Sequence, residues 1–414
     1  MSYINNGVLE PIEGGVCAAK GFLANGIHCG IRKNKAKKDL GLIYSEKKAC
    51  AAAVYTQNLV KGAPLIVTKD NLTDGYAYAV ICNSGNANTC NADGIEIAKK
   101  MCASLGNSLD ISEKDVVVAS TGVIGQPLDV NPIVEAIPSL VAGLGDCSEC
   151  SDYAAEAIMT TDTKKKDVAY RFEIDGVECR IGGIAKGSGM IHPNMATMLV
   201  FVTTDVSISP ELLNEALKED VKTSFNMISV DGDTSTNDMV SVLANGLANN
   251  KTITEKGDAF EIFKAALSAV TTDLCRKIAA DGEGATKLLE CTVKGADKYE
   301  TAAVCAKSVV CSSLLKAAMF GADANWGRVL CALGYSGADI DVNAVDVSFK
   351  SKAGEIEVCK NGAGVAFSEE KAKEILVENE IQILISVGKG EFSATAWGCD
   401  LTYDYVKING DYRT

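Results

Sequence analysis

Histidine is nearly absent from this chain: His28 and His192 are the only two among 414 residues. A serine or threonine hydroxyl is a weak nucleophile and needs a neighbouring base, which in most enzymes of this kind is a histidine. With two histidines, the chain has almost no residue that could complete a Ser-His-Asp relay. Any hydroxyl nucleophile in this protein must take its base from another group.

The sequence also lacks a long apolar run and a targeting segment. No stretch is long and apolar enough to span a bilayer, and the N-terminus from Met1 to Gly7 has no basic region followed by an apolar one. These two absences predict a cytoplasmic protein with no membrane partner.

Positive charge is scarce as well. The formal net charge is −14, which opposes non-specific binding to nucleic acid or to an anionic membrane surface. The one basic run, Lys33 to Lys38, has no aromatic residues interleaved with it, so we interpret it as a solvated turn. The composition predicts a globular protein without a nucleic-acid partner.

Cysteine is abundant, but a disulfide framework is not expected. The 16 cysteines are spread from Cys17 to Cys399 through apolar segments, and without an export signal most should be buried as small hydrophobic residues. Cys147 and Cys150 form the only Cys-x-x-Cys motif, with no second pair and no histidine nearby. We assign it neither a metal nor a redox role.

A glycine-rich loop that begins at Lys186 leads into an apolar run, Met198 to Val202, which is typical of a buried strand. Thr197 lies at the junction. If the Ala196–Thr197 peptide bond were cut, the new α-amine of Thr197, with a pKa of about 7.7 to 8.0, would lie beside its own hydroxyl. The amine could then serve as the base that histidine does not supply.

Residues 186 to 199, Lys-Gly-Ser-Gly-Met-Ile-His-Pro-Asn-Met-Ala-Thr-Met-Leu, resemble the self-processing signature of the ornithine acetyltransferase (ArgJ) family of the cyclic arginine pathway. In that family the threonine cleaves the peptide bond before it and then carries the acetyl group. The resemblance implies an N-terminal chain, 1–196, and a C-terminal chain, 197–414, intertwined in one catalytic unit. It also implies layered sheets and helices of the DmpA-like type.

The hydrophobic patterns independently predict a mixed α/β or α+β fold. The main strands are expected over 40–54, 64–68, 77–82, 116–119, 168–174, 177–184, 198–202, 345–349, 356–358, 381–387 and 393–397. Helices are expected over 95–105, 131–144, 152–159, 210–225, 259–280, 301–320 and 369–378. After residue 397 we expect the end of a strand and a polar tail.

The strand predicted over 116–119 runs into Ser120-Thr-Gly-Val-Ile-Gly125. A Thr-Gly pair in a turn after a strand can aim a hydroxyl and a backbone N–H at one point, as an oxyanion requires. This segment also resembles the oxyanion-hole segment of the family, which points to Thr121 and Gly122.

The same resemblance implies the substrate contacts. These residues are Thr163, Lys186, Thr197, Glu283, Asn409 and Thr414. The segments 83–91 and 321–328 also resemble the family, without a role that we can derive. The segment 231–238 begins like a calcium loop, but Thr236 and Val242 stand where that loop needs glycine and glutamate, so we reject a calcium site.

The family resemblance implies transfer of the acetyl group from N2-acetyl-L-ornithine to L-glutamate through an acetyl-Thr197 intermediate, with ping-pong kinetics. It implies no metal and no required cofactor, and an α2β2 heterotetramer of the processed chains. The sequence leaves open whether acetyl-CoA also serves as acetyl donor, which would make the enzyme bifunctional.

Two other classes of protein remain as alternatives. One is a self-processing amidase or aminopeptidase that passes the acyl group to water. The other is a non-catalytic amino-acid-binding protein in which the Ala196–Thr197 bond stays intact.

Overall fold

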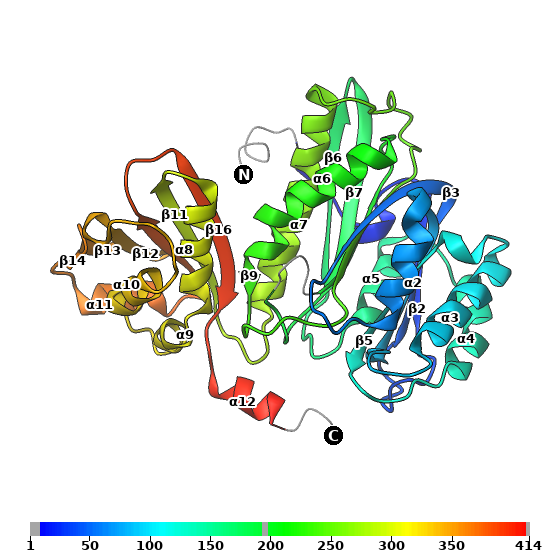
Figure 1. Cartoon of the computed structure of the whole chain (residues 1–414), viewed down its shortest axis with the longest axis horizontal. Coiled ribbons are helices and arrows are strands. Elements are labelled where there is room, and N and C mark those ends of the chain that lie inside the picture. Colours follow the sequence, from blue (N-terminus) through cyan, green and yellow to red (C-terminus); the bar gives the residue numbers. More distant parts are fainter. Residues whose placement is uncertain (1–8, 193–197, 411–414) are drawn as a thin grey trace. The chain divides into compact units, whose positions relative to one another are not determined.

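The computed structural model describes residues 9–192 and 198–410, and the contacts within the chain divide these residues into two units (Figure 1). Unit 1 contains 9–187, 198–225 and 234–274, and unit 2 contains 188–192, 226–233 and 275–410. Each unit has its own β-sheet with helices packed against it. The predicted mixed α/β fold with layered sheets and helices is confirmed.

The sheet of unit 1 combines antiparallel and parallel pairs. In spatial order its strands are β1 (Glu10–Pro11), β6 (Lys166–Ile174), β7 (Val177–Lys186), β8 (Leu199–Thr204), β10 (Met239–Ala244), β3 (Leu40–Tyr55), β4 (Tyr76–Asn86) and β5 (Val116–Val123), with β2 (Phe22–Ile27) paired to β3. The pairs β8–β10 and β4–β5 are parallel, and the other pairs are antiparallel.

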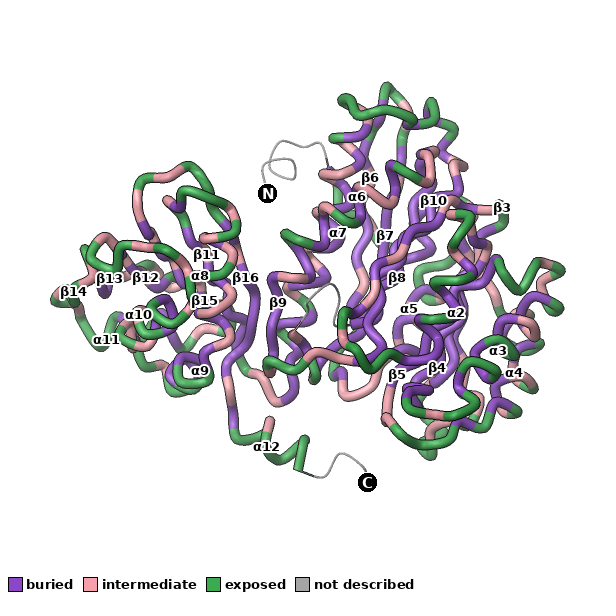
Figure 2. Tube along the Cα trace, viewed as in Figure 1, coloured by how far each residue is buried: buried purple, intermediate pink, exposed green. Residues whose placement is uncertain are grey.

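Helices cover both faces of this sheet because its central strands are apolar on both sides. Along β4, Val80 and Cys82 belong to a core shared with α5 (Ser148–Ile158), whereas Ala79 and Ile81 belong to a core shared with α3 (Gly94–Leu109) and α4 (Asn131–Ala142). The alternation follows from the two-residue period of a strand. Figure 2 shows these strands buried along most of their length. The other helices of the unit are α2 (Ala63–Asn71), α3 (Gly94–Leu109), α4 (Asn131–Ala142), α6 (Pro210–Thr223) and most of α7 (Asp258–Ala280).

The sheet of unit 2 has the order β14 (Ala363–Gly364), β13 (Gly354–Lys360), β12 (Asp346–Ser351), β15 (Glu380–Ser386), β11 (Leu288–Ala296), β16 (Phe392–Cys399) and β9 (Ile228–Ser229). Helix α8 (Tyr299–Cys311) packs on β11 and β16 through Ala302, Cys305, Ala306 and Val309, which recur at helical spacing and are buried. The remaining helices are α9 (Ser313–Phe320), α10 (Trp326–Gly334), α11 (Glu369–Leu376) and α12 (Tyr403–Asn409).

Short 3-10 helices connect several of these elements. They are η1 (Gly15–Cys17), η2 (Leu72–Asp74), η3 (Glu113–Asp115), η4 (Phe225–Met227) and η5 (Val342–Ala344).

The strand predicted over 64–68 is wrong, since these residues lie in α2. An apolar run as short as Leu65 to Val67 does not distinguish a buried strand from a buried helix. Pro64, whose fixed φ suits the first turn of a helix, lies at the start of α2 and is the local signal for the observed structure.

The single helix predicted over 301–320 is also wrong. Ser312 interrupts it, and its hydroxyl accepts the backbone N–H of Leu315 at 3.3 Å, which caps α9. In the described part of the chain, no single helix is long and apolar enough to cross a membrane. Only α8 and α9 taken together pass that test by length and composition, and they are bent by 57°.

The helix predicted over 95–105 and the tail predicted after residue 397 differ from the structure. Helix α3 does not end at Gly106 but continues to Leu109; a Cβ on Gly106 would lie 2.8 Å from the carbonyl oxygen of Ile111, so this glycine permits close packing. The tail expected after residue 397 contains α12.

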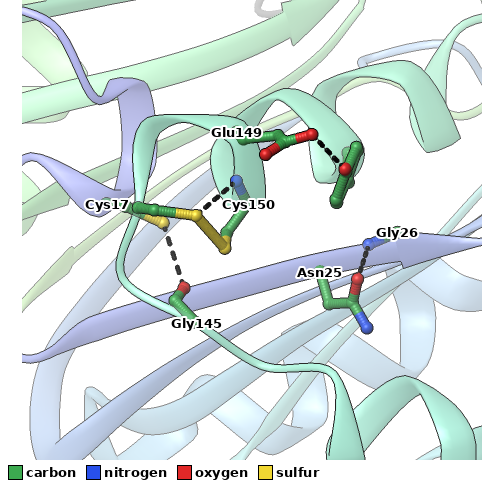
Figure 3. Close-up of a disulfide and its surroundings, with 8 residues drawn as sticks. Cys17, Asn25, Gly26, Gly145, Glu149 and Cys150 are labelled. Carbon is green, nitrogen blue, oxygen red and sulfur yellow. Dashed lines mark hydrogen bonds between the residues drawn. A yellow bond between two sulfur atoms is a disulfide. The ribbon is translucent and has the colours of Figure 1, made fainter.

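The prediction that cysteines stay unpaired holds for most of them but fails at the Cys-x-x-Cys motif. Cys147 and Cys150 form a disulfide at the start of α5 (Figure 3). Cys17 lies close by, and its sulfur donates a hydrogen bond to the carbonyl oxygen of Gly145 at 3.6 Å. Most of the free cysteines are buried, as the sequence predicted.

Candidate active site

The predicted oxyanion turn lies where two parallel strands of unit 1 end side by side. Ser84 and Gly85 of β4 pair with Thr121 and Gly122 of β5. Gly122 has φ +131°, and a Cβ there would lie 2.3 Å from the carbonyl carbon of Gly85. Because only glycine tolerates both the backbone angle and the contact, the turn requires glycine at position 122.

Thr121 is 8% exposed. Its hydroxyl forms no hydrogen bond with any residue that the structure describes. Ser120, the residue before Thr121, does have a bonded hydroxyl, which donates to Asn83 Oδ1 at 2.6 Å. Asn83 Nδ2 in turn donates to the carbonyl oxygen of Asn86 at 3.0 Å. The amide-rich segment 83–91 therefore supports the turn and leaves the Thr121 hydroxyl available as a donor.

Lys186 lies at the end of β7 in the same unit. It pairs with Leu199 of β8, and Leu199 also pairs with Met239 of β10, so the three residues are aligned across neighbouring strands. The Lys186 side chain is 8% exposed and has no hydrogen bond or ion pair within the described residues. A buried ammonium without a direct partner is costly unless an anion binds it.

Asp162, which precedes Thr163, connects its segment by hydrogen bonds to the loop that follows Lys186. Its Oδ1 accepts hydrogen bonds from Lys166 Nζ at 2.6 Å and from the Gly187 N–H at 2.7 Å. Burial alone would raise the pKa of this carboxyl group, but the ammonium groups of Lys166 and Lys186 hold it below its usual range. Asp162 is therefore ionised and already paired, and Thr163 beside it is exposed.

Unit 2 brings together Glu283, Asn409 and the glycine-rich loop. The Glu283 N–H donates to the carbonyl oxygen of Ser188 at 3.1 Å, and Asn409 Nδ2 donates to Glu283 Oε2 at 2.7 Å. A Cβ on Gly189 would lie 2.3 Å from the Glu283 carboxyl carbon. Glu283 is 7% exposed, so its buried carboxyl group packs closely against the backbone of Gly189, where a larger side chain would displace it.

His192 also belongs to unit 2, where its Nδ1 lies 3.1 Å from Ser229 Oγ and 3.6 Å from Cys311 Sγ. Burial, and secondly the nearby ammonium of Lys307, lower the pKa of His192 to about 4. His192 is therefore neutral at pH 7.

The structure thus arranges the predicted residues in two sets. Thr121, Gly122, Thr163 and Lys186 lie in unit 1, and Glu283 and Asn409 lie in unit 2. The predictions for Ala196, Thr197 and Thr414 lie outside the described residues.

Sequence reasoning missed two residues of unit 1, Asn237 and Asp238, because it tested the segment 231–238 only as a calcium loop. Asn237 forms hydrogen bonds around the oxyanion turn, and Asp238 is a buried carboxyl group whose Oδ2 has no hydrogen-bond partner. The only signal in the sequence is a pair of short polar side chains directly before a buried strand.

Comparison with known proteins extends over the whole chain. A family model described as the ArgJ family matches residues 23–414. The arginine biosynthesis bifunctional protein ArgJ of Caldanaerobacter subterraneus subsp. tengcongensis is 52% identical over 407 residues, 98% of this chain and 100% of that protein. The Bacillus subtilis protein of the same name is 47% identical over 419 residues, 100% of both.

Two solved structures are also similar in sequence. The crystal structure of arginine biosynthesis bifunctional protein ArgJ from Bacillus halodurans is 46% identical, with a TM-score of 0.49, and the match covers 51% of this chain and 97% of that one. Ornithine acetyltransferase from Mycobacterium tuberculosis, complexed with ornithine, is 32% identical, with a TM-score of 0.42, covering 45% of this chain and 100% of that one.

Proposed function

Because the chain belongs to the ArgJ family, we propose that it moves the acetyl group of N2-acetyl-L-ornithine to L-glutamate, giving L-ornithine and N-acetyl-L-glutamate for arginine biosynthesis. The observation that carries this proposal is the match to the family over residues 23–414. The geometry supports it with a glycine-dependent turn suited to an oxyanion and a buried ammonium suited to a carboxylate.

The first step is self-processing. Thr197 Oγ attacks the carbonyl carbon of Ala196, the C–N bond breaks, and the acyl group moves from nitrogen to oxygen. Water then hydrolyses the ester, which gives chain 1–196 with a new carboxylate and chain 197–414 with a new α-amine. Each unit contains segments from both sides of this bond, which supports a pair of intertwined chains.

In the transfer reaction Thr197 Oγ attacks the acetyl carbonyl of N-acetylornithine. The new α-amine accepts the hydroxyl proton, ornithine leaves with a proton on its amine, and an acetyl ester of Thr197 remains. The amine of glutamate then attacks this ester, the acetyl C–O bond breaks, and Thr197 Oγ regains a proton as N-acetylglutamate is released. Thr121 and the Gly122 N–H stabilise the oxyanion in both halves of the reaction.

Both substrates carry a carboxylate on the carbon that bears the reacting nitrogen. Lys186 binds this carboxylate, because its ammonium is buried in unit 1 without a direct partner in the described chain. Glu283, oriented by Asn409, faces the side-chain ammonium of ornithine. We propose Thr163 and Thr414 as further substrate contacts.

The relatives are named bifunctional proteins. We propose that this chain also has a second activity, synthesis of N-acetylglutamate from acetyl-CoA and glutamate. In this activity acetyl-CoA is a substrate: Thr197 Oγ attacks its thioester carbonyl, the C–S bond breaks, and CoA leaves as the thiol with the hydroxyl proton. Within residues 9–192 and 198–410, no cluster of three or more histidine, cysteine, aspartate or glutamate residues could hold a metal ion. We also propose an α2β2 heterotetramer of the processed chains.

The decisive experiment is intact mass spectrometry after brief exposure to N-acetylornithine. We expect two chains, with one added acetyl group on the chain that begins at Thr197, and a single uncut, unlabelled chain for Thr197→Ala. Release of free acetate without glutamate would instead indicate an amidase. An uncut wild-type chain that binds N-acetylornithine without turnover would indicate an amino-acid-binding protein.

A further inference from the structure

Asn237 is a buried amide with every hydrogen-bonding position occupied. It is 5% exposed, and its Nδ2 donates to two backbone carbonyl oxygens, of Ala87 at 2.5 Å and of Ser120 at 2.9 Å. Its Oδ1 accepts from the hydroxyl groups of Thr89 and Thr236, each at 2.6 Å. An amide of this kind has two donors and two acceptor sites, so Asn237 has one favoured orientation.

These four bonds connect the oxyanion turn to its surroundings. Ser120 directly precedes Thr121 on β5, and Ala87 and Thr89 lie in the loop that follows β4. Asn237 itself lies two residues before Met239, whose N–H donates to the carbonyl oxygen of Met198 at 2.9 Å. Met198 is the residue after Thr197 in the sequence.

The amide is also confined by its neighbour Gly62. A Cβ on Gly62 would lie 2.6 to 2.9 Å from the side-chain atoms of Asn237, and the Gly62 N–H donates to the carbonyl oxygen of Thr236 at 2.9 Å. Gly62 has φ −61° and ψ 140°, angles that any residue adopts. The glycine at this position therefore makes room for the amide of Asn237.

We propose that Asn237 is a positioning residue that aims the Thr121 hydroxyl and the Gly122 N–H by holding the Ser120 carbonyl group. The Ser120 carbonyl oxygen and the Thr121 N–H belong to one planar peptide unit, so fixing that oxygen fixes the plane from which the turn continues. An oxyanion donor acts only within about 2.7 to 3.1 Å of the developing charge, and a displacement of about 1 Å can cost 10²-fold in rate. The inference rests on the proposed role of Thr121 and Gly122.

The chain offers a matched control at the opposite end of the same strand. Asn71 is also buried, and its Nδ2 also donates to two carbonyl oxygens, of Val116 at 2.8 Å and of Glu113 at 3.2 Å. Asn71→Asp and Asn237→Asp both replace the NH₂ donor by an oxygen and leave two carbonyl groups without that donor. The two variants should therefore lose similar stability.

The experiment measures melting temperature, kcat and KM for N-acetylornithine in the processed wild type, Asn237→Asp and Asn71→Asp, with glutamate saturating. We expect kcat of Asn237→Asp to fall about 10²-fold, close to the effect of losing an oxyanion donor, with KM within about twofold. For Asn71→Asp we expect a similar fall in melting temperature, with kcat within about threefold of wild type. Equal losses of kcat in the two variants, or normal kcat in Asn237→Asp, overturn the proposal.

Thr89→Val provides a second test if Asn237→Asp fails to fold or to process. It removes one hydroxyl group from Asn237 Oδ1 and leaves both donors of the amide in place. We expect kcat to fall about 3- to 10-fold, the effect of one hydrogen bond, with KM unchanged; an unchanged kcat overturns the proposal. If wild-type Thr197 is never acetylated, the proposed function itself fails, independently of these comparisons.

Discussion

Lys186 and Asp238 are two buried ionisable residues of unit 1 that interact electrostatically without a direct hydrogen bond. They are 8% and 3% exposed. Burial raises the pKa of Asp238 well above its usual range, and the Ser235 hydroxyl and the Lys186 ammonium oppose this shift only in part. Burial therefore favours the protonated form of Asp238, which competes less for the Lys186 ammonium than an ordinary ionised aspartate would.

If Lys186 binds the substrate carboxylate, Lys186→Met should raise KM for N-acetylornithine about 10- to 100-fold, since a hydrogen bond to a charged group contributes about 1.5 to 3 kcal/mol. Steady-state kinetics test this effect. Lys48→Met is the control, because Lys48 forms only partly exposed ion pairs in the same unit. An unchanged KM in Lys186→Met would remove the residue from the site.

Replacing Asp238 should change how KM for N-acetylornithine depends on pH. Since the pKa of Asp238 is raised, the wild-type carboxyl ionises only above the usual pH range of an aspartate. The resulting anion would compete for Lys186, so the wild-type KM should increase as the pH rises and this carboxyl loses its proton. Asp238→Asn has no proton to lose at this position, so its KM should lack this increase.

Asp220→Asn is the matched control for that profile. Asp220 is another buried carboxyl with one unpartnered oxygen, on α6 rather than beside Lys186. Its variant should keep the wild-type dependence of KM on pH. Profiles that coincide for wild type and Asp238→Asn would contradict the role assigned to Asp238.

Asp220 should also lower stability at neutral pH. Burial raises its pKa from 3.8 to about 6, so the folded state binds the proton more tightly than the unfolded chain. The contribution of Asp220 to the free energy of unfolding is fully present below about pH 3.8 and is lost as the pH rises through about 6. Asp220→Asn should therefore stabilise the protein by about 1 to 3 kcal/mol at pH 7 and much less at pH 4, as urea unfolding at the two pH values can test.

The Thr121 hydroxyl should contribute to the rate and not to the fold, because it bonds to no described residue. Thr121→Ala should lower kcat by about 10²- to 10³-fold, the effect of one oxyanion donor, with little change in melting temperature. Thr121→Ser keeps the hydroxyl group and should recover most of kcat. A Thr121→Ala enzyme with normal turnover would exclude this residue from the oxyanion hole.

Local signals in the sequence predicted the parts of the fold that depend on neighbouring residues. Strands were predicted over 168–174 and 177–184, and the Asp175-Gly176 pair between them, where both residues have positive φ, forms the turn of the β6–β7 hairpin. The helix predicted over 210–225 begins in the structure at Pro210, and the hydroxyl of Ser209 before it caps the helix by accepting the Leu212 N–H. In contrast, Ser312 was missed as a cap because the apolar pattern continues on both sides of it.

The site was predicted only in part, for a similar physical reason. Thr121 and Gly122 follow a recognisable strand, so their position in a turn could be derived. The role of Asn237 depends on carbonyl groups 117 and 150 residues away, and no local pattern encodes such contacts. Asp238 was missed for the same reason, since Lys186 approaches it only through the pairing of β7, β8 and β10.

The backbone of Gly122 limits how this enzyme can be redesigned. Every side chain larger than hydrogen would collide with Gly85, so a mutant library at position 122 should return almost only glycine. Selection for a different acyl donor would have to act on the hydroxyl of Thr121 or on the supports of the turn, such as Asn237.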